Sequence, residues 1–397
     1  MDRQRSHVDD LRGASRLAVE ATRGVTGLVE AMHATIASGP AILGRPLAGP
    51  ARLATSLVYG TVRGVTQLVG AGIDLALAQL VPLLGSSVPG AEREAVLGVL
   101  NGVLGDYLSE RANPLAIEMR LRHGGEPLDL TTETLRTALP GASSRLVVLV
   151  HGSCGTDLQW TRRGHDHGAA LARDLGFTPI YLHYNSGLHI STTGRAFAAM
   201  LEQLVAAWPV ALDELVIIGH SMGGLVARSA CHLADGAGHA WRSRLRALIT
   251  LGAPHHGAPF ERGGNWIDLL LGISRYSAPL GRLGRIRSAG ITDLRFGNVI
   301  DEDWQGRDRF EHGDDRRHQV ALPADVRCYA VAGTLSTEPG GRRSDGMVPV
   351  ASALGAHATR DLAVPDAHRM IALGVGHVEL LADPTVYAAI RAWLTEP

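Results

Sequence analysis

The stretch Gly219-His220-Ser221-Met222-Gly223-Gly224 directly follows an apolar run, Leu-Val-Ile-Ile, at positions 215–218. A GxSxG sequence at the junction of a strand and a helix places its serine on a sharp turn, where the hydroxyl is presented as a nucleophile. Because the turn is tight, we expect a side chain at Gly219 or Gly223 to collide with the neighbouring strand or helix. The pentapeptide alone is a weak signal, so the remaining sequence must provide partners for Ser221.

Two candidate partners follow in the order acid, then histidine. Asp345 lies just beyond the strand-like run 326–333, and His377 follows a second apolar run at 370–373. Loops at the carboxyl edge of a parallel sheet converge on one place, so we expect Asp345 and His377 to meet Ser221 there. None of the rivals for these two roles follows the end of a strand, and the rivals are Asp325, Asp366, His357 and His368.

A further loop upstream is a candidate oxyanion hole. The uninterrupted apolar run 145–150 predicts a buried parallel strand, and it leads straight into His151-Gly152-Ser153-Cys154-Gly155. A glycine-rich loop in this place can turn a backbone N–H toward the nucleophile, beside the N–H of Met222. We expect Ser153 to supply this second donor, with Cys154 as the rival.

At these motifs the chain resembles the serine esterases and lipases of the α/β-hydrolase superfamily. The closer resemblance is to bacterial lipase-like proteins related to the GPI inositol-deacylases. It covers about residues 140–397 and rests on HGSCG at 151–155, GHSMGG at 219–224, LGAPHHG at 251–257, SDGMVPVASALG at 344–355 and GVGH at 374–377. His255 and His256 resemble a loop that is common in lipases, which implies a structural role. The motifs are specific to the superfamily and say little about the substrate.

The sequence therefore predicts a hydrolase of carboxylic esters, with an ester or a lipid as substrate. Ser221 is the expected nucleophile, His377 the general base and then acid, and Asp345 the group that fixes the imidazole tautomer. Neither a cofactor nor a metal is expected. An acyltransferase shares every one of these motifs and stays open as an alternative. A third alternative is a binding or membrane-scaffolding protein with a vestigial site.

Composition narrows the chemistry further. All 38 basic residues among the 397 are arginine, which excludes Schiff-base lysines, a Ser-Lys dyad and a P-loop lysine. The net charge of −1 gives no reason to expect a nucleic-acid partner. Three cysteines, Cys154, Cys231 and Cys328, are expected to be free thiols.

The first 112 residues are predicted to be an all-helical cap or interaction region. Apolar residues between Val58 and Leu83 recur at steps of three and four, and segment 23–29 is repeated at 63–69. A membrane span over 64–84 is disfavoured by Asp74 and Pro82. The charged start, 1–16, argues against a secretory signal and favours a cytoplasmic protein. We expect the apolar helix faces to pack on the hydrolase domain near the site, with a membrane surface or a second subunit as alternatives.

Residues 113–397 are predicted to form an α/β-hydrolase fold, a mostly parallel sheet flanked by helices. A β-hairpin over 116–130 opens the domain, and parallel strands are expected at 145–150, 178–183, 214–219, 245–251, 326–333 and 369–374. The long gap after 251 predicts a lid insertion at about 257–320, in which Trp266 lines the acyl pocket. Trp160 either lines that pocket or packs below it.

The role of a group of histidines can be interpreted in two ways. His165-Asp166-His167, with His183 and His189, has the residue types and the His-x-His spacing of a zinc site. The same residues suit helix capping at the start of the helix near Gly168 and hydrogen bonding within loops, and we favour this second interpretation. His151 and His220 are expected to orient the loops around Ser221 without taking protons.

Overall fold

The computed structural model describes residues 90–258, 288–307, 315–338, 341 and 343–396. The predicted apolar helix face, the internal repeat, the segment 64–84 and Trp266 lie outside these residues. The chain divides into two compact units, and the unit that contains the sheet comprises Leu97–Ile273 and Arg287–Pro397. Among the described residues, no helix has both the length and the apolar character needed to cross a bilayer.

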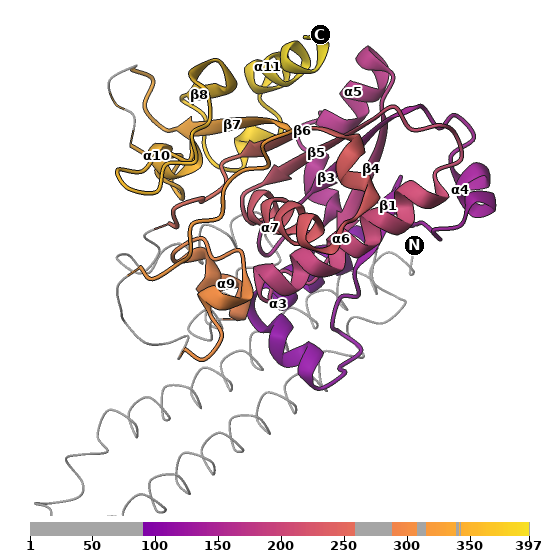
Figure 1. Ribbon diagram of the computed structural model, residues 1–397, viewed down its shortest axis with the longest axis horizontal. Coiled ribbons are helices and arrows are strands. Elements are labelled where there is room, and N and C mark those ends of the chain that lie inside the picture. The colour runs from indigo at the N-terminus through magenta and orange to yellow at the C-terminus, as the bar shows by residue number, and fades with distance from the viewer. Residues whose placement is uncertain (1–89, 259–287, 308–314, 339–340, 342, 397) are drawn as a thin grey trace, which may run out of the picture. The chain divides into compact units, whose positions relative to one another are not determined.

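One sheet organises this unit, with strand order β2-β1-β4-β3-β5-β6-β7-β8 (Figure 1). The strands are β1 (Arg120–His123), β2 (Glu126–Pro127), β3 (Arg145–Val150), β4 (Thr178–His183), β5 (Glu214–His220), β6 (Leu245–Leu251), β7 (Arg327–Thr334) and β8 (Arg369–Leu373). Strands β3 to β8 run parallel, whereas β1 is antiparallel to both β2 and β4. The loops that follow the parallel strands therefore gather at one edge.

The strands form where apolar runs are continuous. β3, β4 and β6 have the predicted bounds, and the ends of β5, β7 and β8 differ from the prediction by one residue. The runs in β3 and β5 are buried on both faces, which removes the alternation of polar and apolar residues that a half-exposed strand shows. Gly124 and Gly125 make the turn between β1 and β2 with φ values of 59° and 85°, as the glycine pair predicts.

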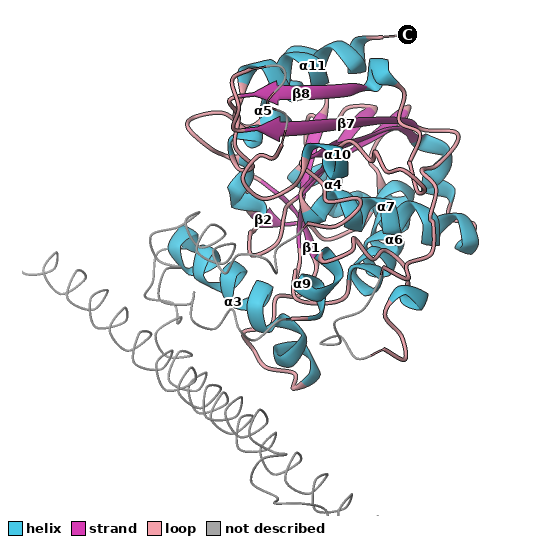
Figure 2. Cartoon of the chain, turned by 90° about the vertical axis from the view of Figure 1, so that its left-hand side faces the viewer, coloured by secondary structure: helices cyan, strands magenta, loops and turns pink. Residues whose placement is uncertain are grey.

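Helices cover both faces of the sheet. On one face α6 (Ile190–Ala207) and α7 (Met222–Ala237) share a core with Leu146, Val148 and Val150 of β3. On the other face α5 (His167–Leu175) and α11 (Pro384–Thr395) share a core with Val147 and Leu149. Figure 2 shows α11 lying along β8 at the top of the view. This arrangement confirms the predicted α/β-hydrolase fold for the described residues.

Shorter helices complete the described part, namely α4 (Thr132–Ala138), α9 (Ala289–Leu294) and α10 (Val350–Ala353). The helix α3 (Gly90–Glu110) contributes its residues from Leu97 onward to the unit that contains the sheet. There α3 adjoins α9 (Figure 1), because the Ser288 hydroxyl donates to Gly102 O at 2.6 Å and Ala289 N–H donates to Asp106 Oδ2 at 2.9 Å. The predicted lid falls largely on 259–287 and 308–314, outside the described residues.

Candidate active site

Ser221 stands on the turn between β5 and α7 with φ 53° and ψ −122°, a conformation that is strained for a residue with a side chain. A Cβ on Gly219 would lie 2.5 Å from Gly224 N at the start of α7, and one on Gly223 would lie 2.2 Å from Val150 O at the end of β3. Both contacts are with backbone atoms, so neither can be relieved by a side-chain rotation. The predicted need for glycine on both sides of the turn is confirmed.

Asp345 and His377 are brought together at the same edge of the sheet. His377 Nδ1 lies 2.7 Å from Asp345 Oδ2, and both side chains are buried. Backbone N–H groups of Met347 and Val348 donate to Asp345 Oδ1 at 2.9 and 2.7 Å. Burial alone would raise the pKa of the Asp345 carboxyl, but the His377 imidazole and these hydrogen bonds outweigh it and lower the pKa. Asp345 is therefore held as a carboxylate.

The end of β6 and the residue that follows it lie beside Ser221 and His377. Leu251 O accepts a hydrogen bond from Ser221 N–H at 2.8 Å. A Cβ on the next residue, Gly252, would lie 3.1 Å from His377 Cε1. His377 Nε2 is buried and forms no hydrogen bond with any described group, Ser221 Oγ included. In serine hydrolases without substrate, the hydrogen bond between the serine hydroxyl and the imidazole is commonly long. The free Nε2 is the atom that a general base would use.

In the loop after β3, the two candidate oxyanion donors differ in whether their backbone N–H already has an acceptor. Cys154 has φ 57°, and its N–H donates to Ser186 Oγ at 3.0 Å. By contrast, Ser153 N–H and Met222 N–H donate to no acceptor among the described residues. The amide of the rival, Cys154, is thus already engaged. Ser186 was not singled out from the sequence, although its place just after β4, at the same edge of the sheet, is a signal that would have found it.

His220 connects this region to the His377 loop. Its Nε2 lies 3.0 Å from His377 O, and a carbonyl can only accept, so Nε2 carries the proton. Its Nδ1 then accepts from the Gln159 side-chain amide at 3.1 Å. Burial lowers the pKa of the His220 imidazole to about 3. A neutral His220 therefore links two loops and does not take up a second proton near neutral pH.

His151 has a similar position in the loop that follows β3. Its Nε2 accepts from Tyr184 N–H at 3.4 Å, so its Nδ1 donates to Gly152 O at 2.8 Å. The ring stacks on Tyr184 with centroids 4.2 Å apart. Burial lowers the pKa of His151 to about 3. This imidazole is also neutral, and it orients the backbone of the loop that carries Ser153.

The histidine group near α5 is arranged for packing and capping. Asp166 Oδ1 accepts from Ala169 N–H at 2.9 Å and caps α5. His165 Nε2 lies 2.8 Å from His167 Nδ1, and His167 Nε2 lies 3.0 Å from Leu380 O. These hydrogen bonds engage both nitrogens of His167 and Nε2 of His165. The remaining two histidines lie beside other carboxylates, His183 at 2.8 Å from Asp157 and His189 at 3.0 Å from Asp293.

Other sequence-predicted residues lie around this centre. Trp160 is fully buried in the core on the α5 side of the sheet, and its ring stands edge-on to His220 with centroids 6.5 Å apart. This place fits packing below the site, one of the two interpretations left open. His256 Nε2 lies 3.0 Å from Gly355 O and joins the loop after β6 to the end of α10. Among the rivals for the acid and histidine roles, Asp325, Asp366 and His357 are exposed, and His368 Nδ1 lies 3.1 Å from Cys328 O.

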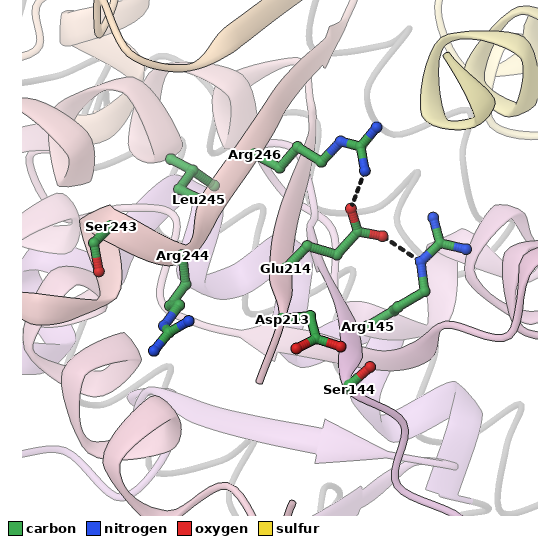
Figure 3. Close-up of a pocket in the computed structure, with 8 residues that line it drawn as sticks. All are labelled: Ser144, Arg145, Asp213, Glu214, Ser243, Arg244, Leu245 and Arg246. Atoms are coloured by element: carbon green, nitrogen blue, oxygen red, sulfur yellow. Dashed lines mark hydrogen bonds and ion pairs between the residues drawn. The ribbon is translucent and has the colours of Figure 1, made fainter. Parts of the chain in front are cut away.

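An open pocket of about 460 Å³ lies at the opposite edge of the sheet, at the amino ends of β3, β5 and β6 (Figure 3). Glu214 lies between two arginines there and pairs with Arg145 through Oε1 and with Arg246 Nη1 through Oε2 at 2.9 Å. The charge of Glu214 is thus compensated by these two arginines. The pocket lies at the far ends of the strands from Ser221.

Comparisons with known proteins agree with this fold. Residues 142–318 match the family model described as PGAP1-like alpha/beta domain, which confirms the predicted resemblance to α/β-hydrolase esterases and lipases. The matched part includes Ser221 and ends before Asp345 and His377. No curated protein matches the sequence.

Several solved structures are similar at low identity. The mature form of a lipase from Bacillus licheniformis has a TM-score of 0.43 at 16% identity, covering 70% of this chain and 98% of the lipase. An esterase from Pyrococcus furiosus has a TM-score of 0.37 at 12% identity, covering 64% and 80%. A phospholipase from Legionella pneumophila, in complex with thio-NAD, has a TM-score of 0.32 at 18% identity, covering 53% and 44%.

Proposed function

We propose that the protein is a serine hydrolase that cleaves carboxylic esters through an acyl-enzyme intermediate. One observation carries the proposal: a buried carboxylate–imidazole pair, Asp345–His377, lies at the edge of the sheet where Ser221 stands on a strained turn. The only unpartnered nitrogen of that imidazole is Nε2, the atom that a base needs to accept a proton from a serine hydroxyl.

The reaction follows from these positions. His377 Nε2 accepts the Ser221 hydroxyl proton while Oγ attacks the carbonyl carbon of the ester, and Asp345 stabilises the imidazolium that results. The N–H groups of Ser153 and Met222 bind the negative oxygen of the tetrahedral intermediate, each contributing about 3 kcal/mol. The imidazolium then gives its proton to the leaving alcohol. Water repeats the sequence on the acyl-enzyme and releases the acid.

The substrate is proposed at the level of an ester or a lipid ester. The predicted lid at 257–320, Trp266 within it, and the packing of the N-terminal helices on the hydrolase domain remain predictions of the same kind. A membrane surface or a second subunit stays the alternative partner of these helices. They bear on which acyl chains are accepted. The ester bond itself is cleaved by Ser221, His377 and Asp345, with the N–H groups of Ser153 and Met222 as donors to the oxyanion.

A p-nitrophenyl ester series of increasing acyl length tests the proposal on the full-length protein. Ser221→Ala should lower kcat by about a millionfold and should prevent labelling by a fluorophosphonate probe, because the probe reacts with an activated serine. Ser243→Ala, an exposed serine at the opposite edge of the sheet, is the matched control and should retain both. Hydrolysis that persists in Ser221→Ala would refute the assignment. Ester exchange with an added alcohol would favour the acyltransferase alternative.

A further inference from the structure

The helix α3 presents glycine where it meets the loops around Ser221. Gly98, Gly102 and Gly105 are spaced four and three residues apart, so they share one helix face. A glycine inside a helix costs about 1 kcal/mol relative to alanine. Three glycines on one face therefore indicate that another part of the backbone packs there so closely that a side chain has no room.

The contacts of this glycine face show what it supports. A Cβ on Gly102 would lie 2.3 Å from Cys154 Sγ and 2.7 Å from Cys154 Cα, and one on Gly98 would lie 2.9 Å from Gly155 O. A Cβ on Gly105 would lie 1.8 Å from Asn185 Oδ1. The glycine face of α3 thus rests directly on the loops that follow β3 and β4. The first of these loops carries Ser153.

Hydrogen bonds also connect α3 to the loop after β4, and that loop to the loop after β3. Asn185 Nδ2 donates to Gly105 O at 2.8 Å, which joins the loop after β4 to the helix. The next residue in that loop, Ser186, accepts the Cys154 N–H at 3.0 Å. Cys154 is therefore held between the Gly102 surface and the Ser186 hydroxyl, in a left-handed conformation with φ 57°. The peptide that precedes it, with the Ser153 N–H, is positioned by these two contacts.

We infer that α3 is a positioning element for the oxyanion hole, in which Gly102 provides the surface that fixes Cys154 and thereby orients Ser153 N–H. The inference rests on the proposed function. α3 lies outside residues 142–318, so this support comes from a segment that the family match does not include. A hydrogen-bond donor lowers the barrier only when it is already aimed at the developing charge, and displacements of about 1 Å cost on the order of a hundredfold in rate.

Gly102→Ala in the full-length protein tests the inference. The added methyl group must displace Cys154, so we expect kcat to fall about 10- to 100-fold while KM changes less than about threefold, because the donor acts in the transition state. Val103→Ala is the matched control. Val103 is the next residue of the helix and only 3% exposed, so its truncation should lower the unfolding temperature and leave kcat unchanged.

A second variant and a direct measurement complete the test. Cys154→Gly in the Gly102→Ala background removes the sulfur that the methyl meets, and φ 57° suits glycine, so kcat should recover in part. If Gly102→Ala does not fold, Ser186→Ala replaces it, because loss of this hydroxyl frees Cys154 N–H and should also lower kcat more than KM. Amide chemical shifts of Ser153 and Cys154 report the loop position independently of activity.

The outcomes separate the two proposals. Wild-type protein that neither hydrolyses esters nor reacts with a fluorophosphonate would refute the proposed function, and the amide shifts would still show whether Gly102 sets the loop. An active wild type together with a Gly102→Ala variant of unchanged kcat and unchanged Ser153 shift would overturn the role of α3. Equal loss of kcat in Gly102→Ala and Val103→Ala would also overturn it, because a general loss of stability would then explain both.

Discussion

Asp345 illustrates how a single side chain sets the state of a neighbour. Its Oδ1 accepts two backbone N–H groups while Oδ2 accepts a hydrogen bond from His377 Nδ1, so the carboxylate requires a proton on Nδ1 and Nε2 of the neutral ring is unprotonated. Both oxygens of Asp345 act as acceptors, which an ionised carboxylate allows. An asparagine side chain in the same place has the same shape, but only one of its two terminal atoms is an acceptor.

Asp345→Asn should therefore lower kcat by about 10⁴ with the fold preserved. The amide oxygen will stay with Met347 N–H and Val348 N–H, which turns the amide NH₂ toward His377 Nδ1 and places the imidazole proton on Nε2. Kinetics on a p-nitrophenyl ester, with near-ultraviolet circular dichroism as the check on folding, measures this. Asp366→Asn is the control, because the Asp366 side chain is 98% exposed. A loss below tenfold would indicate that another carboxylate acts.

The histidines near α5 lead to a prediction about metals. His165 and His167 are hydrogen bonded to each other, and His167 also contacts Leu380 O. A serine mechanism generates its nucleophile without a metal ion. Activity of the purified protein should therefore be unchanged by EDTA. If turnover falls on chelation and returns when zinc or calcium is added, the capping interpretation of this group is wrong.

At the scale of elements, a buried amide joins α3 to the chain that leads into β1. Asn101 is fully buried, its Nδ2 donates to Leu97 O and Leu115 O, and its Oδ1 accepts from Ile117 N–H. One side chain thus satisfies three backbone groups. Only an amide offers both donors and an acceptor in this space.

Asn101→Ala should lower the free energy of unfolding by about 3 kcal/mol, because buried backbone groups that lose their partners cost about 1 to 3 kcal/mol each. Urea denaturation followed by circular dichroism measures the change. Ser109→Ala, on the exposed end of the same helix, should stay within about 0.5 kcal/mol of the wild type. Equal midpoints for both variants would show that α3 does not contribute to the cooperative unit.

At the scale of the whole molecule, buried neutral histidines make stability depend on pH. Burial lowers the pKa of His151 and His220 to about 3 and that of His167 to about 4. In the unfolded chain each imidazole titrates near its ordinary pKa of about 6.5. Below that pH the unfolded state binds more protons than the folded state. The stability that these neutral imidazoles contribute is thus complete above about pH 6.5 and is lost as the pH falls from there toward 3.

These three histidines should contribute a slope of about 4 kcal/mol per pH unit to the free energy of unfolding near pH 5, at about 1.4 kcal/mol per unit for each. His255 and His256, whose pKa values burial also lowers, should make the decline steeper. Urea titrations at a series of pH values measure the slope. His167→Gln should reduce it by about 1.4 kcal/mol per unit. His357→Gln, at an exposed position, is the control. A stability that is flat between pH 6.5 and 4.5 would contradict the assignment of neutral buried imidazoles.

Local sequence determined the strands and the sharp turn at Ser221. A continuous apolar run such as 145–150 is buried as a strand between two layers of helices. The strand-to-helix turn at GxSxG leaves no room for side chains at its two glycines. The order of the motifs also predicted that Asp345 and His377 would meet, because loops after parallel strands gather at one edge. Their roles in catalysis remain predictions.

Contacts between distant segments decided the rest. The acceptor for Cys154 N–H is Ser186, 32 residues beyond Cys154, and the residue that Cys154 packs against is Gly102, in a helix that precedes the sheet. Likewise, His165 and His167 are engaged partly by Leu380, which lies 213 residues beyond His167. Periodicity and motif spacing describe neighbours along the chain. They do not state which hydrogen-bond partner another loop supplies, because only packing of the sheet and its helices brings these loops together.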